Sequence, residues 1–557
     1  MWFLLHFLLV ACAGPSADTG EPPAPATCDA PAVQPPACDS APVGRGAVVP
    51  GPGDPGFDAA LDASALARDR QSNGITVWAT GVTCEVSVSD AADRALVESF
   101  LTDPAAGWDF EAATGRPLTD VVDAWWKAAG AYAGVSIATD AYRYGALRDE
   151  GAACAEVEVA RERVIGALEA LHLAQAITGV EGVIARGFAR ADLPGGGEVA
   201  LTALFDDEGN PLPEEKTNGT WRADNSGGLY PDFVWEDSCS RDQYIGWVAG
   251  MAAAWEVVRN DSTIPQSLKD RLQTDAEALA RSLMVVRDNG YDLEIRDADG
   301  RMTYHGILNE QSIDRLYVPD FQNGLNATMS LGIVASLAFV AEEPDIDAWL
   351  ADALIADRGL PTIVRDMLAP QIDFGTSTNY SNTNMAFIGG WMAVRYLCGD
   401  DARGQVREGL QTLYARPGED RQPIEQSQAL YHLVQAVSVG GPTPWAAGGA
   451  LDDDALARTL DGLSGMRPAP FWDSYVENCD AQEVADARCT LDDRSVVDLW
   501  VGEEVVSKSP LSIAIRPPSN YHWRSNPYLP NGGGAGDTLY PNVDWRFVYW
   551  SGRYAKR

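Results

Sequence analysis

The sequence predicts a mainly α-helical fold in which antiparallel helix hairpins alternate with long aromatic loops and short β-hairpins. Apolar residues recur at steps of three and four in one segment after another, which is the spacing of an amphipathic helix. The segments between these helices alternate between short and long. The long segments carry tryptophan, tyrosine and glycine, with short alternating runs typical of β-hairpins.

The first residues predict export. An apolar run over residues 1–11 ends in small residues before Cys12 and is too short to span a bilayer. The run Leu9-Val10-Ala11-Cys12 resembles the bacterial lipobox, which implies that residues 1–11 are a signal peptide and that Cys12 is lipidated. The usual basic n-region is missing, so a plain secretory signal or a mis-assigned start codon is the alternative. Ala13 rather than Asp follows the cysteine, which in the lipoproteins it resembles goes with the outer membrane.

Three further parts follow the signal peptide. Residues 12–56 are rich in proline and alanine and lack an apolar period, so we expect a disordered tether. Residues 57–114 are expected to form an α/β segment that packs on the main domain, with two short strands between Ile75 and Val88. Residues 115–557 are expected to form the helical main domain.

A buried helix in the middle of the chain is predicted most clearly. Ser240 and Gln243 have the spacing of a capping box, so the helix is expected to begin at Arg241. Gly246 and Gly250 form part of a small-residue ridge that lets a neighbouring helix approach closely, while larger apolar residues occupy another face. We therefore expect a helix packed on two sides.

The other helices are predicted by the same periodicity. They are expected over residues 91–101, 118–132, 154–177, 265–286, 325–340, 347–355, 382–397, 401–414, 424–437 and 452–463. Hairpins are expected around Asp206–Asn210 and around Asp297–Gly300. Residues 516–557 are dense in aromatic residues and arginine, so we expect them to close over the domain as an ordered cap, entering as a strand or a final helix turn.

Charge and cysteine content limit the possible functions. The chain has 41 basic and 80 acidic residues, a net charge of −39, which disfavours nucleic acid and leaves the lipid as the expected contact with a membrane. Without Cys12, eight of the nine cysteines remain, and an even number in an exported protein favours disulfides over metal ligands. Our pairing hypothesis joins Cys28 with Cys38, Cys84 with Cys154, Cys239 with Cys398, and Cys479 with Cys489.

Successive helix pairs with long aromatic loops between alternate pairs resemble the (α/α)6 toroid of the six-hairpin glycosidases and related polysaccharide lyases. The resemblance covers residues 115–557 and concerns the fold, because no diagnostic catalytic signature accompanies it. A helical solenoid is the competing architecture, although no fixed repeat length is visible.

The resemblance implies an active site in the loops at one mouth, where glycoside hydrolysis uses two carboxylates. The candidates are Asp242, Glu310 and Asp373, each in or beside a polar loop. Each also has an ordinary interpretation. Asp242 suits the first turn of a helix, Glu310 suits a solvated loop, and the polar run after Asp373 suits turns and caps.

Several residues are candidates for binding sugar. Trp221 and Trp235 offer aromatic faces, and Asn379 and Asn382 offer amides, although core packing and helix capping explain the same residues. His305 is the histidine that we single out. His172 and His432 lie inside predicted helices and are expected in the core. No pair of histidines has metal spacing, so no metal or other cofactor is expected.

Three functions are consistent with this pattern. The first is an exported, membrane-tethered glycoside hydrolase that uses Asp242 and Glu310 as its acid and base. The second is a polysaccharide lyase in which Tyr304 or His305 removes a proton and Asn309 or Arg241 neutralises a uronate carboxylate. The third is a surface lipoprotein that binds glycan or organises the envelope without catalysis.

Overall fold

The computed structural model describes residues 38–40, 44–440, 443–444, 451–491, 494–502 and 504–556. The predicted lipidation site Cys12, the signal peptide, Cys28 and most of the predicted tether lie outside these residues. Sixteen α-helices, accompanied by small antiparallel sheets, occur in the described part of the chain, which confirms the mainly α-helical fold class.

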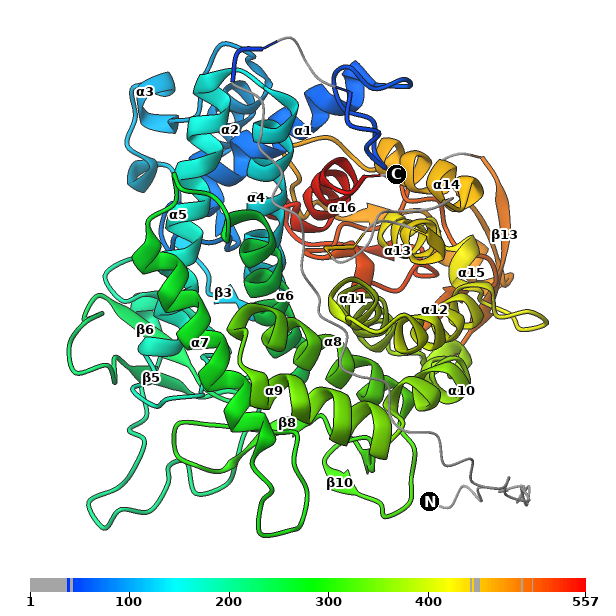
Figure 1. Ribbon diagram of the computed structural model, residues 1–557. Helices are drawn as coiled ribbons and strands as arrows, with labels where there is room; N and C mark the ends of the chain where they lie inside the picture. The colour runs from blue at the N-terminus through cyan, green and yellow to red at the C-terminus, as the bar shows by residue number, and fades with distance from the viewer. Residues whose placement is uncertain are drawn as a thin grey trace.

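Six of these helices, which we call the core helices, contact one another in a closed cycle (Figure 1). In order they are α4 (Gly130–Glu150), α6 (Arg241–Val258), α8 (Gly324–Ala341), α11 (Tyr380–Tyr396), α13 (Ala429–Gly440) and α16 (Val543–Tyr554). Each contacts the next, and α16 contacts α4. All eighteen residues of α8 are buried, as expected for a helix that is apolar on every side. In the described residues α8 is the one helix long and apolar enough to cross a membrane, and it lies wholly inside the protein.

A second set of helices covers the core helices from outside. These outer helices are α1 (Ala59–Gln71), α5 (Cys154–Ala176), α7 (Gln266–Met284), α10 (Leu360–Ile372), α12 (Asp400–Ala415) and α14 (Asp453–Gly465). Among their contacts, α5 packs on α4, α7 and α10 on α8, α12 on α11, α14 on α13, and α1 on α16. In α7, for example, Leu272 and Leu279 are buried while the opposite face carries charged residues, because only one side meets the core. Shorter helices are α2 (Ala91–Thr102), α3 (Phe110–Thr114), α9 (Pro344–Ala348) and α15 (Ala481–Ala485).

The contact between α4 and α6 depends on glycine. A Cβ atom at Gly134 would collide with the backbone of Gly246, and one at Gly246 would collide with the carbonyl of Gly130. The small-residue ridge predicted on α6 is therefore confirmed, and the helix that approaches it is α4.

The start of α6 at Arg241 is confirmed, but the predicted capping box is wrong. The Ser240 hydroxyl donates to Asp242 Oδ1 at 2.5 Å and does not cap the helix. Gln243 Oε1 accepts a 2.8 Å hydrogen bond from the backbone N–H of Ala131. Gln243 thus satisfies an N–H group left unpaired at the start of α4.

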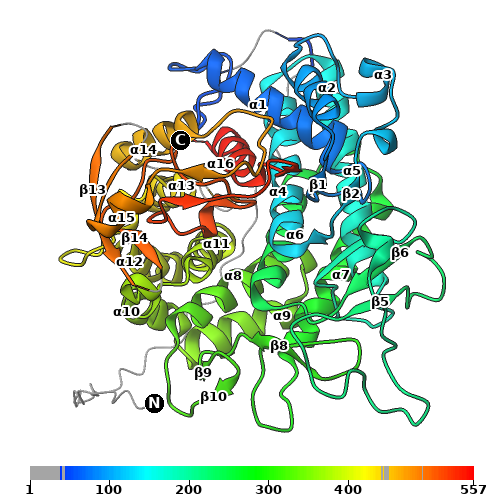
Figure 2. The same ribbon diagram turned by 180° about the vertical axis from the view of Figure 1, so that it is seen from behind.

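The sheets are small and antiparallel. Their orders are β16-β1-β2, β3-β4-β6-β5, β7-β8, β9-β10, β11-β15 and β12-β13-β14. The bounds are β1 (Val86–Ser87), β2 (Ala124–Trp125), β3 (Ala128–Ala129), β4 (Gly187–Arg190), β5 (Trp221–Ala223), β6 (Phe233–Glu236), β7 (Glu294–Arg296), β8 (Met302–Ile307), β9 (Ser312–Ile313), β10 (Leu316–Tyr317), β11 (Val476–Glu477), β12 (Arg488–Thr490), β13 (Val496–Val501), β14 (Val505–Ser507), β15 (Asn531–Gly532) and β16 (Thr538–Leu539). Figure 2 shows β13 and β14 beside α12 and α15, with β5 and β6 on the other side of the molecule.

Both expected hairpins are present. Strands β7 and β8 pair around Asp297–Gly300, and the Asp206 carboxylate accepts the backbone N–H groups of Glu208 and Asn210 in the other turn. Two other predictions differ from the structure. Ile75 lies in a π-helix, Ser72–Thr76, so only the second of the two strands expected between Ile75 and Val88 is present, as β1. The helix predicted over residues 118–132 is wrong, because Leu118–Asp120 form a 3-10 turn and the strands β2 and β3 precede α4.

Only one of the four predicted disulfides is confirmed, Cys479–Cys489. Cys38 bonds to Cys154 instead of Cys28, which leaves Cys84 as a buried free thiol. The predicted pair between Cys239 and Cys398 is also wrong, because Cys239 is a buried free thiol and Cys398 is disulfide-bonded.

The C-terminal segment is buried, as predicted, but its helix belongs to the core. Helix α16 completes the cycle of core helices and does not lie over them. The residues before it lie across the starts of neighbouring helices. Tyr431 donates to the Trp523 carbonyl at 2.5 Å, and the His522 N–H donates to Asp544 at 2.6 Å.

Candidate active site

The starts of the core helices face one side of the ring, which we call the mouth. Gln243 of α6 contacts the start of α4, and Arg241 donates to Asn326 of α8 at 2.8 Å. Across the mouth from these residues, the His522 backbone N–H donates to Asp544 at the start of α16. The His522 carbonyl accepts from the Gln428 side chain just before α13. The long loops that precede the core helices therefore meet at the mouth.

A half-buried carboxylate, Glu85, is held at the mouth by residues distant in sequence. The side-chain amide of Asn520 donates to Glu85 Oε1 at 2.6 Å and to the Tyr132 hydroxyl at 3.4 Å. The Tyr132 ring lies 5.8 Å from the Tyr521 ring, and the Arg524 guanidinium lies 5.2 Å from its centroid. We call Glu85, Tyr132, Asn520, Tyr521 and Arg524 the Glu85 cluster.

The environment favours the protonated form of Glu85. Burial raises the pKa of Glu85 above its usual value, and the Asn520 hydrogen bond and the charge of Arg524 only partly oppose this effect. Burial also raises the pKa of Tyr132, and the charges of Glu85 and Asp242 add to that shift. The Gln243 side chain, whose amide donates to Asp242, also accepts from the Ala131 N–H beside Tyr132, so Asp242 as well as Glu85 is tied to the start of α4.

Asp242 lies in the first turn of α6 and is half-buried. Its carboxylate accepts from the Ser240 hydroxyl at 2.5 Å and from the Gln243 amide at 3.1 Å, which fixes its orientation. Two carboxylates in different environments are suited to divide the roles of proton donor and base. Sequence reasoning identified Asp242 but missed Glu85.

An exposed indole adjoins Glu85. Trp126 donates its backbone N–H to the Glu85 carbonyl at 3.0 Å and its indole N–H to Ser87 at 3.1 Å, while 49% of the residue remains exposed. Such a ring provides an apolar face beside an acid.

A second group at the mouth contains His305. Its Nδ1 lies 2.8 Å from Asp314 Oδ1, and Arg241 lies 3.8 Å from the same oxygen. The Tyr304 ring contacts His305, with a centroid separation of 4.8 Å, and the Arg315 guanidinium lies 4.1 Å from the Tyr304 centroid. The structure thus brings together three predicted residues, Arg241, Tyr304 and His305.

Glu310 is occupied by structural contacts. It is buried and forms a two-point ion pair with Arg358, which also binds Asp292. Asn309 is buried as well and donates to Asp292 at 3.0 Å. Both residues therefore hold the loop before α8 together.

Asp373 is similarly engaged. It forms an ion pair with Arg416 and accepts from the Gly375 backbone N–H at 2.7 Å. No contact between described residues joins Asp373 to Asp242 or to Glu310.

The predicted sugar-binding residues have different surroundings. Trp235 is fully buried and donates to the Ala223 carbonyl at 2.8 Å. Trp221 is half-exposed, with Lys127 5.9 Å from its ring centroid. Asn379 caps α11 by accepting from Ser381 N–H at 3.0 Å, and Asn382 is half-buried in the first turn.

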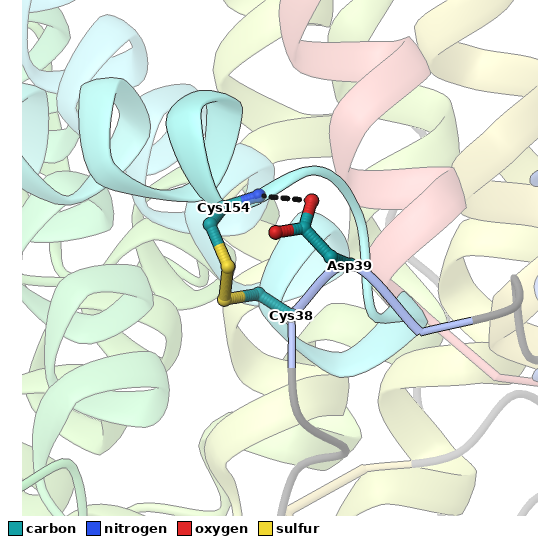
Figure 3. Close-up of side chains that lie close together, drawn as sticks. All are labelled: Cys38, Asp39 and Cys154. Atoms are coloured by element: carbon teal, nitrogen blue, oxygen red, sulfur yellow. Dashed lines mark hydrogen bonds between the residues drawn. A yellow bond between two sulfur atoms is a disulfide. The ribbon is translucent and has the colours of Figure 1, made fainter.

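Among the described residues, one group has its possible metal-ligand atoms close together, namely Cys38, Asp39 and Cys154 (Figure 3). The two sulfur atoms are joined in a disulfide, and Asp39 accepts from the Cys154 backbone N–H at 3.1 Å. Because a disulfide offers no thiolate, this group is explained as a covalent link.

The chain matches no protein-family model and no curated protein.

Proposed function

We propose that this protein is an exported, membrane-tethered glycoside hydrolase whose core and outer helices form an (α/α)6 toroid. The closed cycle of contacts among the six core helices supports the toroid, as does the cover of six outer helices. Disulfides such as Cys38–Cys154 support export, because such bonds persist in oxidising compartments. Cys12 would carry the lipid.

The observation that carries the proposal is that both carboxylates are tied to the start of α4 at the mouth, Glu85 through Asn520 and Asp242 through Gln243. Burial raises the pKa of Glu85, which favours its protonated form. Glu85 is the proposed general acid, which donates its proton to the oxygen of the glycosidic bond. Asp242 is the proposed second carboxylate, acting as base or nucleophile. Trp126 offers the face on which a sugar ring can pack.

The test is activity on a panel of plant, algal and bacterial glycans. Replacing a general acid or base lowers the rate by a factor of about 100 or more. We therefore expect such a loss for Glu85→Gln and for Asp242→Asn. Glu98→Gln on the exposed face of α2 is the control and should leave the rate unchanged. Full activity of both site variants on a glycan that the wild type cleaves would refute the assignment.

A second candidate function is polysaccharide elimination, favoured by the contact of His305, Tyr304 and Arg241 around Asp314. His305 or Tyr304 would remove the proton from the carbon next to a uronate carboxylate. The C–O bond at the neighbouring carbon would then break to leave a carbon–carbon double bond, and the departing oxygen would take a proton from water. Arg241 would neutralise the carboxylate. Ultraviolet absorbance of an unsaturated product, lost in His305→Ala, would identify this reaction.

Glycan binding without catalysis is the third candidate. It is favoured by the ion pairs that occupy Glu310 and Asp373, since these remove two of the three carboxylates expected in a shared site. Binding that survives in Glu85→Gln and Asp242→Asn, with no cleavage by the wild type, would favour this function.

A further inference from the structure

The arginines of the C-terminal segment differ in their surroundings. Arg546 is buried and pairs with Asp69 at 2.7 Å and Asp140 at 2.7 Å. Arg553 is also buried and binds Glu150 at 2.8 Å. These two arginines hold α16 against its neighbours and are not available to a ligand.

Arg524 has no such partner. It is half-buried at the mouth, and its guanidinium lies over Tyr132 without an ion pair or side-chain hydrogen bond to any residue in the described ranges. It does not pair with Glu85, although its charge lowers the pKa of that carboxyl. None of its nitrogens is among the buried polar atoms that lack a partner, so its N–H donors are accessible from solvent and free to bind a ligand.

The other cations near Glu85 and Asp242 already have partners. Lys127 forms an ion pair with Glu236. Arg241 donates to Asn326 at 2.8 Å and lies 3.8 Å from Asp314. Among the described cations near Glu85 and Asp242, Arg524 is therefore the one whose guanidinium has no side-chain partner.

We propose that Arg524 binds an anionic group of the substrate, a carboxylate or a sulfate ester, so that the substrate of the Glu85 cluster is an acidic glycan. This inference rests on the proposed hydrolase function and names its substrate class. The planar guanidinium presents paired N–H donors that match two oxygens of such a group. The guanidinium lies over the Tyr132 ring, 5.2 Å from its centroid, and Tyr132 shares the Asn520 amide with the proposed general acid, Glu85.

The charge of the whole protein limits this substrate class further. A net charge of −39 repels a densely charged polymer, and one cation at the mouth does not reverse that field. We therefore expect a glycan with isolated acidic groups to bind better than a polyanion of the same length.

The experiment measures binding by calorimetry in a Glu85→Gln background, where cleavage does not interfere. The probes are a tetrasaccharide with one glucuronate, its carboxyl-reduced neutral counterpart, a singly sulfated tetrasaccharide, and tetragalacturonate. The variants are Arg524→Gln, Arg524→Lys and, as control, Arg259→Gln. Arg259 is also half-buried over an aromatic ring, 5.0 Å from the Phe339 centroid, but lies at the opposite end of α6.

We expect the Glu85→Gln protein to bind at least one singly charged probe about tenfold more tightly than the neutral one, as suits a charge-assisted contact. Arg524→Gln should abolish this preference and change the affinity for the neutral probe by no more than about twofold. Arg524→Lys should retain part of the preference, and Arg259→Gln all of it. The probe that shows the preference, carboxylate or sulfate, identifies the anionic group that Arg524 binds.

Several results would overturn the inference. One is that Arg524→Gln weakens the binding of neutral and charged probes equally and also lowers the melting temperature of the protein. This result would indicate a structural role for Arg524. Another is that no charged probe binds better than the neutral one. Failure of the hydrolase proposal gives a different result, in which the wild type cleaves no glycan but Arg524→Gln still abolishes the charged preference.

Discussion

Asn520 donates a 2.6 Å hydrogen bond to Glu85, a residue 435 positions earlier in the chain. The bond joins the residue just before β1 to the segment before α16. The same Asn520 amide also donates to the Tyr132 hydroxyl at the start of α4. The proposed acid is therefore positioned by the two ends of the described chain together.

We predict that Asn520→Ala changes the pH dependence of activity. The Asn520 hydrogen bond lowers the pKa of Glu85, so its removal should raise that pKa further. If Glu85 acts as general acid, activity falls as Glu85 ionises, and the alkaline limb of the profile should move to higher pH. The measurement is kcat/KM against pH for both proteins.

A profile that keeps its position while the rate falls uniformly would contradict this prediction. Ser525→Ala is a suitable control. The Ser525 hydroxyl donates to the His522 carbonyl in the same segment and does not bond to Glu85.

A second prediction concerns acid stability. Burial lowers the pKa of His432 to about 3, and its Nδ1 lies 2.8 Å from the Tyr414 hydroxyl. Because the unfolded chain binds a proton near pH 6.5 and the folded protein does not, stability is lost as pH falls below about 6.5. The loss reaches up to about 3 kcal/mol for this residue at pH 4.

His432→Gln should therefore flatten the fall in the free energy of unfolding between pH 6.5 and 4, measured by urea denaturation, even if the variant is less stable at pH 7. The same substitution at the solvent-accessible His305 is the control. Equal pH slopes for the wild type and His432→Gln would refute the assignment.

A third prediction tests the revised disulfides. The Cys38–Cys154 bond closes a loop of 116 residues, for which the chain-entropy estimate is about 5 kcal/mol. Cys154→Ser should lower the free energy of unfolding by an amount of that order. Cys84 and Cys239, both buried and free, should react with a thiol reagent only after unfolding.

Peptide mapping under non-reducing conditions is the direct measurement. A peptide that joins Cys84 to Cys154 would contradict the structure and restore the pairing first expected from sequence. The Cys479–Cys489 link serves as an internal control, because sequence and structure agree on it.

The success of sequence reasoning depended on how local each feature is. The start of α6 at Arg241 and its glycine ridge follow from neighbouring residues, so both were predicted. Helix α4 was missed because it is buried on nearly every side and rich in alanine and glycine, so it has no polar face to mark its period. The capping box failed because Gln243 found an unpaired N–H group on another helix.

The candidate site shows the same limit. Asp242 was found because a polar loop precedes a clear helix, whereas Glu85 lies in a short extended run whose partner is far along the chain. A single sequence carries no signal for such a contact. Glu310 and Asp373 resembled site residues because their loops are polar, but that polarity serves ion pairs with Arg358 and Arg416.

The last prediction concerns the contact between α4 and α6, on which the position of both Tyr132 and Asp242 depends. Gly246→Ala places a Cβ atom against the carbonyl of Gly130, which is backbone and cannot turn aside. We expect a loss of about 3 kcal/mol or more in the free energy of unfolding, as for severe overpacking of a core. Gly404→Ala is the matched control, because Gly404 lies in the outer helix α12 with open space around its Cβ position. This substitution should raise the free energy of unfolding by about 0.5–1 kcal/mol, since alanine favours the helix more than glycine does. Urea denaturation of the two variants measures both effects, and a Gly246→Ala protein as stable as the wild type would show that the two helices do not approach as closely as the structure describes.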